Sequence, residues 1–136
     1  MEKFKRIIIP VDNTEDSKKA VKKGAHLAKL LDVEAKIITV NDTHQFISSV
    51  VIEEKLKKEA TAFLEEFKKI AEEFGIKIET QLVTGNPAEE IVKFANDDDL
   101  IIMAHHDKTK GMDRFTEKNI SRDVVRKASC SVLVIK

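Results

Sequence analysis

The chain has 136 residues, 24 of them basic and 24 acidic, so its formal net charge is zero. This length suits a single domain over residues 1–136, and a hydrophobic fraction of 42% can supply its core. The balanced charge excludes a globally basic nucleic-acid binder, and the ordinary apolar content excludes a disordered chain. No apolar run approaches the roughly 20 residues of a membrane-spanning helix.

The first residues and the cysteine content favour a cytoplasmic protein. The segment from Met1 to Arg6 is largely charged, and the apolar run behind it stops at Val11, which is unlike a secretory signal. Cys130 is the only cysteine, so no intrachain disulfide can form, as is usual in a reducing compartment.

The first part of the chain alternates between strand and helix patterns. Runs of β-branched residues predict buried strands over residues 5–11 and 35–40. Between them, small and apolar residues recur at three- and four-residue spacing, which predicts a helix over residues 15–31. Asn13 and Thr14 are the candidates for its N-cap.

The rest of the chain continues this alternation. Residues 41–51 have no clear period, and a strong helical stripe then runs from Ile52 to Phe74, with Gly75 placed as its C-cap. The later predictions are a half-exposed strand over 76–83, a helix from Pro87 to about Ala95, a strand over 99–103, a polar loop over 104–114, a helix over 116–127 and a final strand over 132–135. Strands that alternate with helices predict an α/β domain with a parallel sheet and helices on both faces.

This fold class has two consequences for function. Ligands of parallel sheets bind beyond the carboxyl ends of the strands, where the strand order reverses. We therefore expect a crevice near Asp12, Val40 and the segment that follows Met103. The last strand is apolar on both faces and no helix follows it, so at a sheet edge it would pair with a second copy as a homodimer. The residues of this predicted interface are Val132, Leu133, Val134 and Ile135.

Several motifs, in their order and spacing, resemble the universal stress protein family over nearly the whole chain. They are Ile7-Ile8-Ile9-Pro10-Val11-Asp12, Gly85-Asn86-Pro87-Ala88-Glu89-Glu90-Ile91, Asp99-Leu100-Ile101-Ile102-Met103 and the ending from Ser121 to Val134. The resemblance implies a five-stranded parallel sheet of order 3-2-1-4-5, a Rossmann-like fold of the adenine nucleotide alpha hydrolase type. It also implies dimerisation through the last strand.

The nucleotide-binding members of this family have a glycine-rich loop after the fourth strand, and this chain departs from it. Their pattern is Gly, two residues, Gly, nine residues, then Gly-Ser or Gly-Thr, which lets the backbone approach phosphates. Ala104 and Asp107 replace the first two glycines, Lys118-Asn119 replaces the last pair, and the gap is one residue longer. The Asp107 carboxylate would repel a triphosphate unless a metal ion intervenes. The resemblance is thus to a branch with a degenerate phosphate loop.

The base-binding part of the family site is better kept. Val11 and Val40 match the positions that flank the adenine, and Asp12 matches the acidic residue after the first strand. The resemblance implies the candidate nucleotide-binding residues Pro10, Val11, Asp12, Val40, Met103, Ala104, His105, Asp107, Lys118 and Asn119. Asp12 can equally cap the helix that follows it, and both interpretations stay open.

Two further clusters and the single cysteine each have a chemical and a structural interpretation. His105-His106-Asp107 contains metal-ligand types, but adjacent residues usually point apart, so hydrogen bonding in a loop is favoured and no metal site is predicted. Asp97-Asp98-Asp99 looks like a cation site, but it is expected to join a helix to a strand on the amino side of the sheet. Cys130 is expected to be a small apolar group rather than a redox centre.

We predict a dimeric stress-response or regulatory protein of the universal stress type, with unidentified protein partners, no catalytic site and a weak small-ligand crevice. The alternative is a member that binds ATP, with or without Mg²⁺, through a divergent phosphate loop; no other cofactor is expected. A phosphoacceptor receiver domain is rejected because Leu82-Val83-Thr84 offers no Asp at the end of the third strand. A metal-dependent hydrolase built on Asp12 and His105-His106 lacks an evident third ligand.

Overall fold

The computed structural model describes residues 3–42, 50–105 and 119–136. The strands are β1 (Arg6–Pro10), β2 (Glu34–Asp42), β3 (Ile78–Gly85), β4 (Asp99–Ala104) and β5 (Ser131–Ile135). The helices are α1 (Glu15–Leu31), α2 (Val50–Glu72), α3 (Pro87–Phe94) and α4 (Ile120–Lys127). The strands form one parallel sheet in the order β3-β2-β1-β4-β5, which confirms the predicted fold class and strand order.

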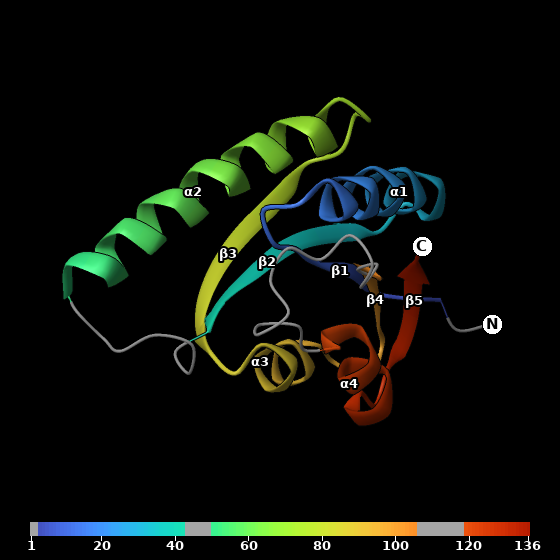
Figure 1. Ribbon diagram of the computed structural model, residues 1–136. Helices are drawn as coiled ribbons and strands as arrows, with labels where there is room; N and C mark the ends of the chain where they lie inside the picture. The colour runs from blue at the N-terminus through green and yellow to red at the C-terminus, as the bar shows by residue number, and fades with distance from the viewer. Residues whose placement is uncertain (1–2, 43–49, 106–118) are drawn as a thin grey trace.

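Helices cover both faces of the sheet, with α1 and α2 on one face and α3 and α4 on the other (Figure 1). The isoleucines of β1 serve both faces in turn, because successive side chains of a strand point to opposite sides. Ile7 and Ile9 belong to the cluster under α1 and α2, and Ile8 belongs to the cluster under α3 and α4. Within the described ranges, none of the helices is both long and apolar enough to cross a membrane.

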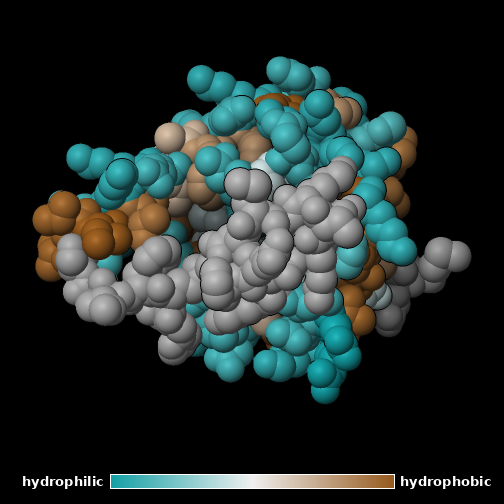
Figure 2. Space-filling model, viewed as in Figure 1, coloured by the Kyte–Doolittle hydropathy of each residue, from teal (hydrophilic) through white to brown (hydrophobic). Residues whose placement is uncertain are grey.

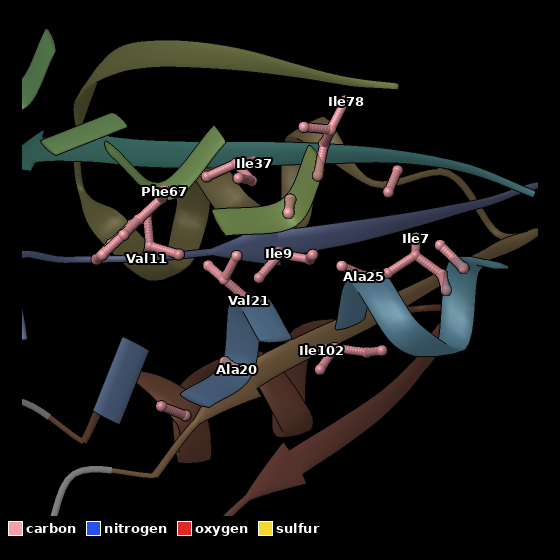
Figure 3. Close-up of a cluster of buried hydrophobic side chains, with 14 of the residues drawn as sticks. Ile7, Ile9, Val11, Ala20, Val21, Ala25, Ile37, Phe67, Ile78 and Ile102 are labelled. Atoms are coloured by element: carbon pink, nitrogen blue, oxygen red, sulfur yellow. The ribbon is translucent and has the colours of Figure 1, made fainter. Parts of the chain in front are cut away.

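The cluster under α1 and α2 brings helix and sheet into close contact (Figure 3). α1 faces the strands with the small residues Ala20, Gly24 and Ala25, all of which are buried. Gly24 allows a close approach, because a Cβ atom there would stand 2.6 Å from Ile9 Cδ1. The spacing that predicted this helix therefore also allows it to lie directly on β1.

The boundaries of several elements differ from the predictions. β2 runs on to Asp42 and β3 to Gly85 because the two strands stay paired to these residues. β3 begins at Ile78 rather than at residue 76, because the chain first turns through Gly75, whose φ of +80° is the left-handed conformation that favours glycine. α2 begins at Val50, two residues before the predicted start. The predicted helix over 116–127 is present as α4, but it begins at Ile120 because Asn119 is its N-cap; residues 116–118 lie outside the described part of the chain.

The amino end of the sheet holds a buried ion pair. Asp99 is 1% exposed, and its Oδ2 accepts hydrogen bonds from Arg6 Nε at 2.9 Å and from the Asn96 N–H at 2.7 Å. The Arg6 guanidinium also donates to Phe94 O and lies 5.0 Å from the centre of the Phe94 ring. The acidic run that ends in Asp99 therefore joins α3 to β4 on the amino side of the sheet, as predicted.

β5 forms an edge of the sheet and pairs with β4 alone among the described strands. Val132 packs into the cluster under α3 and α4, and Ile135 packs against the cluster under α1 and α2. Leu133 is 42% exposed. The edge position on which the dimer argument depends is thus present, and the pairing with a second copy stays a prediction.

Candidate functional site

A crevice opens where β1 and β4 separate near their carboxyl ends. Backbone pairing between β1 and β4 ends at Ile8 and Ile101, whereas pairing between β1 and β2 continues to Pro10 and Ile38. Val11 N donates to Ile38 O at 2.8 Å, so strand alternation directs the Pro10 backbone toward β4, where proline has no N–H to donate. Pro10 therefore ends this ladder at the point of strand-order reversal, where parallel sheets bind ligands.

The crevice is mainly apolar and small. Its cavity volume of about 80 Å³ is well below the roughly 300–1,000 Å³ of typical small-molecule pockets. It is lined by Pro10, Val11, Asp12, Ser17, Ile38, Val40, Pro87, Ile91, Met103, Ala104, Ile120 and Ser121. A cavity of this size suits a flat fragment such as a base better than a whole nucleotide.

Asp12 lines the crevice and is oriented by the first turn of α1. Its Oδ1 accepts hydrogen bonds from the hydroxyls of Thr14 and Ser17, at 2.5 and 2.8 Å. Ser17 Oγ in turn accepts a bond from the Asp12 N–H at 2.9 Å. The cap of α1 is Thr14, whose Oγ1 accepts from the Ser17 N–H at 3.1 Å. Thr14, and not Asp12, is therefore the N-cap of α1. The Asp12 carboxylate lies at the crevice as an oriented hydrogen-bond acceptor.

A buried hydroxyl holds the backbone beside Asp12. Thr39 is 4% exposed, and its Oγ1 donates to Val11 O at 2.7 Å. Val11 N already donates to Ile38 O, so β2 satisfies both backbone polar groups of Val11. This wall of the crevice is therefore fixed by hydrogen bonds as well as by packing.

α3 and α4 both begin beside the crevice. Asn86 caps α3 and Asn119 caps α4, and each side-chain oxygen accepts a bond from the backbone N–H three residues later at 3.1 Å. The first turns of these helices bring Pro87 and Ile120 to the lining. Asn119 thus has a capping role, and it is not among the described residues that line the crevice.

The structure brings most of the predicted strand-end residues together. Pro10, Val11, Asp12, Val40, Met103 and Ala104 all line the crevice. His105 follows β4, is half-buried, and donates its backbone N–H to Ile135 O at 2.8 Å. It is not among the lining residues, and Asp107 and Lys118 lie outside the described residues.

Sequence reasoning missed six residues of the lining, which are Ser17, Ile38, Pro87, Ile91, Ile120 and Ser121. Its candidates came from the ends of strands and from the segment that follows β4, whereas all but one of the missed residues lie on helices. The helix-start signal of Asn86 and Pro87 could have found part of the set, because a helix that follows a strand begins at the carboxyl end of the sheet.

The described residues contain no cluster suited to a metal ion, and the reactivity of the Cys130 thiol can be judged from its surroundings. Within them, no three His, Cys, Asp or Glu side chains lie close enough together to hold a metal ion. His106 and Asp107 lie outside these residues, so the interpretation of His105-His106-Asp107 stays a prediction. Burial, and secondly the nearby Asp99 carboxylate, raise the pKa of the Cys130 thiol, which disfavours the reactive thiolate.

Comparison with known proteins identifies the family. Residues 3–136 match the model of the universal stress protein family. The chain is 39% identical over 141 residues to universal stress protein MJ0531 of Methanocaldococcus jannaschii. The aligned region covers 98% of this chain and 82% of that protein.

Solved structures agree with this match. Hypothetical protein MJ0577 superimposes with a TM-score of 0.79 at 34% identity, over 98% of this chain and 96% of that one. The universal stress protein from Archaeoglobus fulgidus in complex with dAMP gives a TM-score of 0.71 at 21% identity over 100% of both chains, a likeness of fold alone. The family match and the identity to MJ0531 extend over nearly the whole length, and the chain belongs to the universal stress protein family.

Proposed function

We propose that this universal stress protein is a regulatory protein without a catalytic site, whose crevice binds an adenine-type base weakly. The observation that carries the proposal is the convergence of Val11, Val40 and Met103, from three neighbouring strand ends, on one apolar crevice. A flat base gains free energy when its faces leave water for such side chains. The Asp12 carboxylate, oriented by two hydroxyls, adds an acceptor for an amino group of the base.

We expect weak binding because the described residues of the crevice provide few groups that could bind a phosphate. Ala104 lines the crevice where the nucleotide-binding members carry a glycine, so its methyl group takes space that a close approach would need. The Asn119 side chain is engaged in capping α4. Asp107 and Lys118 remain proposed members of the site. Most of the binding free energy should therefore come from the base.

Two observations support an adenine nucleotide as the wider ligand class. The relative from Archaeoglobus fulgidus was solved in complex with dAMP. In this chain, Ile120 and Ser121 in the first turn of α4 line the crevice, and helix N-termini attract anions. The second observation favours the alternative function, in which ATP, with or without Mg²⁺, is held through the divergent loop.

We also propose that this single domain, residues 1–136, works as a cytoplasmic homodimer that pairs through β5. The exposed backbone edge of β5 can accept a second strand, and the 42% exposed Leu133 would be covered by it. Val132, Val134 and Ile135 complete the proposed interface. A regulatory role without catalysis then requires protein partners, which stay unidentified.

Calorimetric titration with adenosine, AMP, ATP and ATP with Mg²⁺ tests the ligand proposal. If the base carries the binding, the dissociation constants of all four ligands should agree within about tenfold, or about 1.4 kcal/mol. ATP that binds roughly 100-fold more tightly than adenosine would favour the alternative. No heat from any ligand at millimolar concentration would reject both.

A pair of matched variants links the binding to the crevice. Val40→Glu introduces a carboxylate into the lining, and we expect it to abolish adenosine binding. Val83→Glu changes the residue paired with Val40 on β3, which is half-buried on the same side of the sheet but is not part of the lining. Adenosine should still bind this control. Equal loss in both variants would show that the sheet, and not the crevice, was disturbed.

A further inference from the structure

The amino-terminal end of α2 projects past the sheet (Figure 1). We name this segment, residues 50–59, the α2 tip; the first buried residue of the helix is Ala60. Val50 and Val51 are 73% and 76% exposed. Figure 2 shows hydrophobic surface gathered at this end of the helix. A single exposed apolar side chain is common on protein surfaces. Two adjacent exposed valines on a protruding helix form a contiguous apolar patch, which is typical of an interaction site.

One side of the α2 tip combines these valines with charged side chains. Val50, Glu54, Lys57 and Thr61 follow one another at spacings of four, three and four residues, so they share one helix face. Val51 and Lys58 adjoin them on the same side. We define the outer face of α2 by these six residues, Val50, Val51, Glu54, Lys57, Lys58 and Thr61, all of which are exposed.

The charges of the outer face are separated along the helix. Glu54 comes first, and Lys57 and Lys58 follow in the next turn. None of the three takes part in a salt bridge between described residues. A second α2 that runs antiparallel across a two-fold axis would bring each Glu54 opposite Lys57 and Lys58 of the other copy. A parallel arrangement would bring like charges together instead.

We propose that the outer face of α2 is a weak self-association surface that pairs antiparallel with the same face of a second copy. The charges select the antiparallel register, and the valines leave water against Thr61 and its neighbours on the other copy. The tip is only about 15 Å long, so it buries much less than the roughly 800 Å² per partner of a stable interface. The association is therefore concentration-dependent.

The location of this surface lets it act alongside the proposed β5 interface. α2 packs chiefly against β3, which forms the sheet edge opposite β5. Two different two-fold surfaces on opposite edges of one molecule can both be occupied at once. Pairing through α2 would thus join dimers into larger assemblies at high protein concentration.

Charge reversal followed by mixing tests the proposal. One protein carries Glu54→Lys and the other carries Lys57→Glu with Lys58→Glu, and both carry Val134→Lys so that pairing through β5 does not contribute. Each protein alone places like charges across the two-fold axis, whereas the mixture places opposite charges there. In sedimentation velocity, the mixture should associate at least about tenfold more tightly than either protein alone, and added salt should weaken it.

A matched pair of substitutions further along α2 provides the control. Glu65→Lys and Lys69→Glu, each combined with Val134→Lys, change two exposed residues beyond the α2 tip, and their mixture should stay as monomeric as its components. Circular dichroism checks that every variant keeps its helix. Equal association of the outer-face mixture and of its separate components would overturn the proposal. Association of the control mixture to the same degree would also overturn it, because general charge attraction would then account for the result.

Discussion

The ion pair between Arg6 and Asp99 ties the start of β1 to the start of β4, so its removal is a sharp test of what stabilises the sheet. Asp99 Oδ2 accepts from Arg6 Nε at 2.9 Å and from the Asn96 N–H at 2.7 Å. The Asp99 side chain is 1% exposed and that of Arg6 24%. Arg6→Met keeps an apolar stem against the Phe94 ring but leaves the buried carboxylate with one charged partner fewer.

The expected loss follows from the burial of the pair. Removal of one partner from a buried ion pair typically costs about 3–5 kcal/mol of unfolding free energy. Because part of Arg6 is exposed, solvent screens the remaining charge, and we expect about 2–3 kcal/mol for Arg6→Met. Asp99→Asn keeps an acceptor for the Asn96 N–H but leaves the guanidinium without its anion, and should cost about 2 kcal/mol. The double variant should lose less than the sum by at least about 1 kcal/mol.

Urea unfolding followed by circular dichroism measures these differences at one fixed protein concentration. The neighbouring pair Lys5 and Asp98 is the matched control, because it joins the same two segments at 3.3 Å with side chains that are 78% and 56% exposed. Lys5→Met should cost less than about 1 kcal/mol. Equal losses for Arg6→Met and Lys5→Met, or losses at Arg6 and Asp99 that simply add, would contradict a stabilising contact between the two side chains.

Three further outcomes are expected. Gly24→Ala would place a Cβ atom 2.6 Å from Ile9 Cδ1, so it should lower the unfolding free energy by about 1–3 kcal/mol in urea, and Ile9→Val should restore part of that loss; an unchanged urea midpoint would contradict the close contact. Burial raises the pKa of the Cys130 thiol, so iodoacetamide should modify the folded protein more slowly than the urea-unfolded protein at mildly alkaline pH. Since the folded pKa is the higher one, this group's contribution to stability is complete below the unfolded pKa and disappears as the pH rises through the folded pKa; equal modification rates would contradict the raised value. Val134→Lys should convert the proposed dimer into a monomer in light scattering, whereas Leu30→Lys, at a 70% exposed position of α1, should not; a dimer mass in both variants would reject pairing through β5.

The elements of the fold were predictable wherever a local pattern causes them. The predicted bounds of α1 agree with the structure because small residues mark the buried face and Thr14 marks the start. The end of β2 was missed because Asn41 and Asp42 carry no strand signal of their own. They are strand residues because β3 pairs with them as far as Gly85, and the sequence near them does not report a partner that lies far along the chain.

Of the residues that line the crevice, the sequence predicted only those at the carboxyl ends of strands. Val11 and Val40 follow from the rule that ligands bind beyond the carboxyl ends of strands, and both line the crevice. Ser17, Ile91 and Ile120 were missed because their inclusion depends on how closely the first two turns of three helices approach the strand ends. That approach is set by packing between elements, which hydrophobic periodicity within one element does not contain.

The two ends of β1 have different roles: residues at its amino end stabilise the fold, and residues at its carboxyl end line the crevice. At its amino end, Arg6 fastens the strand to β4 through buried Asp99. At its carboxyl end, Pro10 has no N–H for β4, the ladder stops, and the crevice opens beside Val11. Substitutions at Arg6 should therefore change the unfolding free energy while the folded protein keeps its affinity for adenosine, whereas Val40→Glu should abolish adenosine binding in a protein that is still folded. An Arg6→Met protein that is fully folded by circular dichroism yet has lost adenosine binding would mean that the two ends of β1 are coupled.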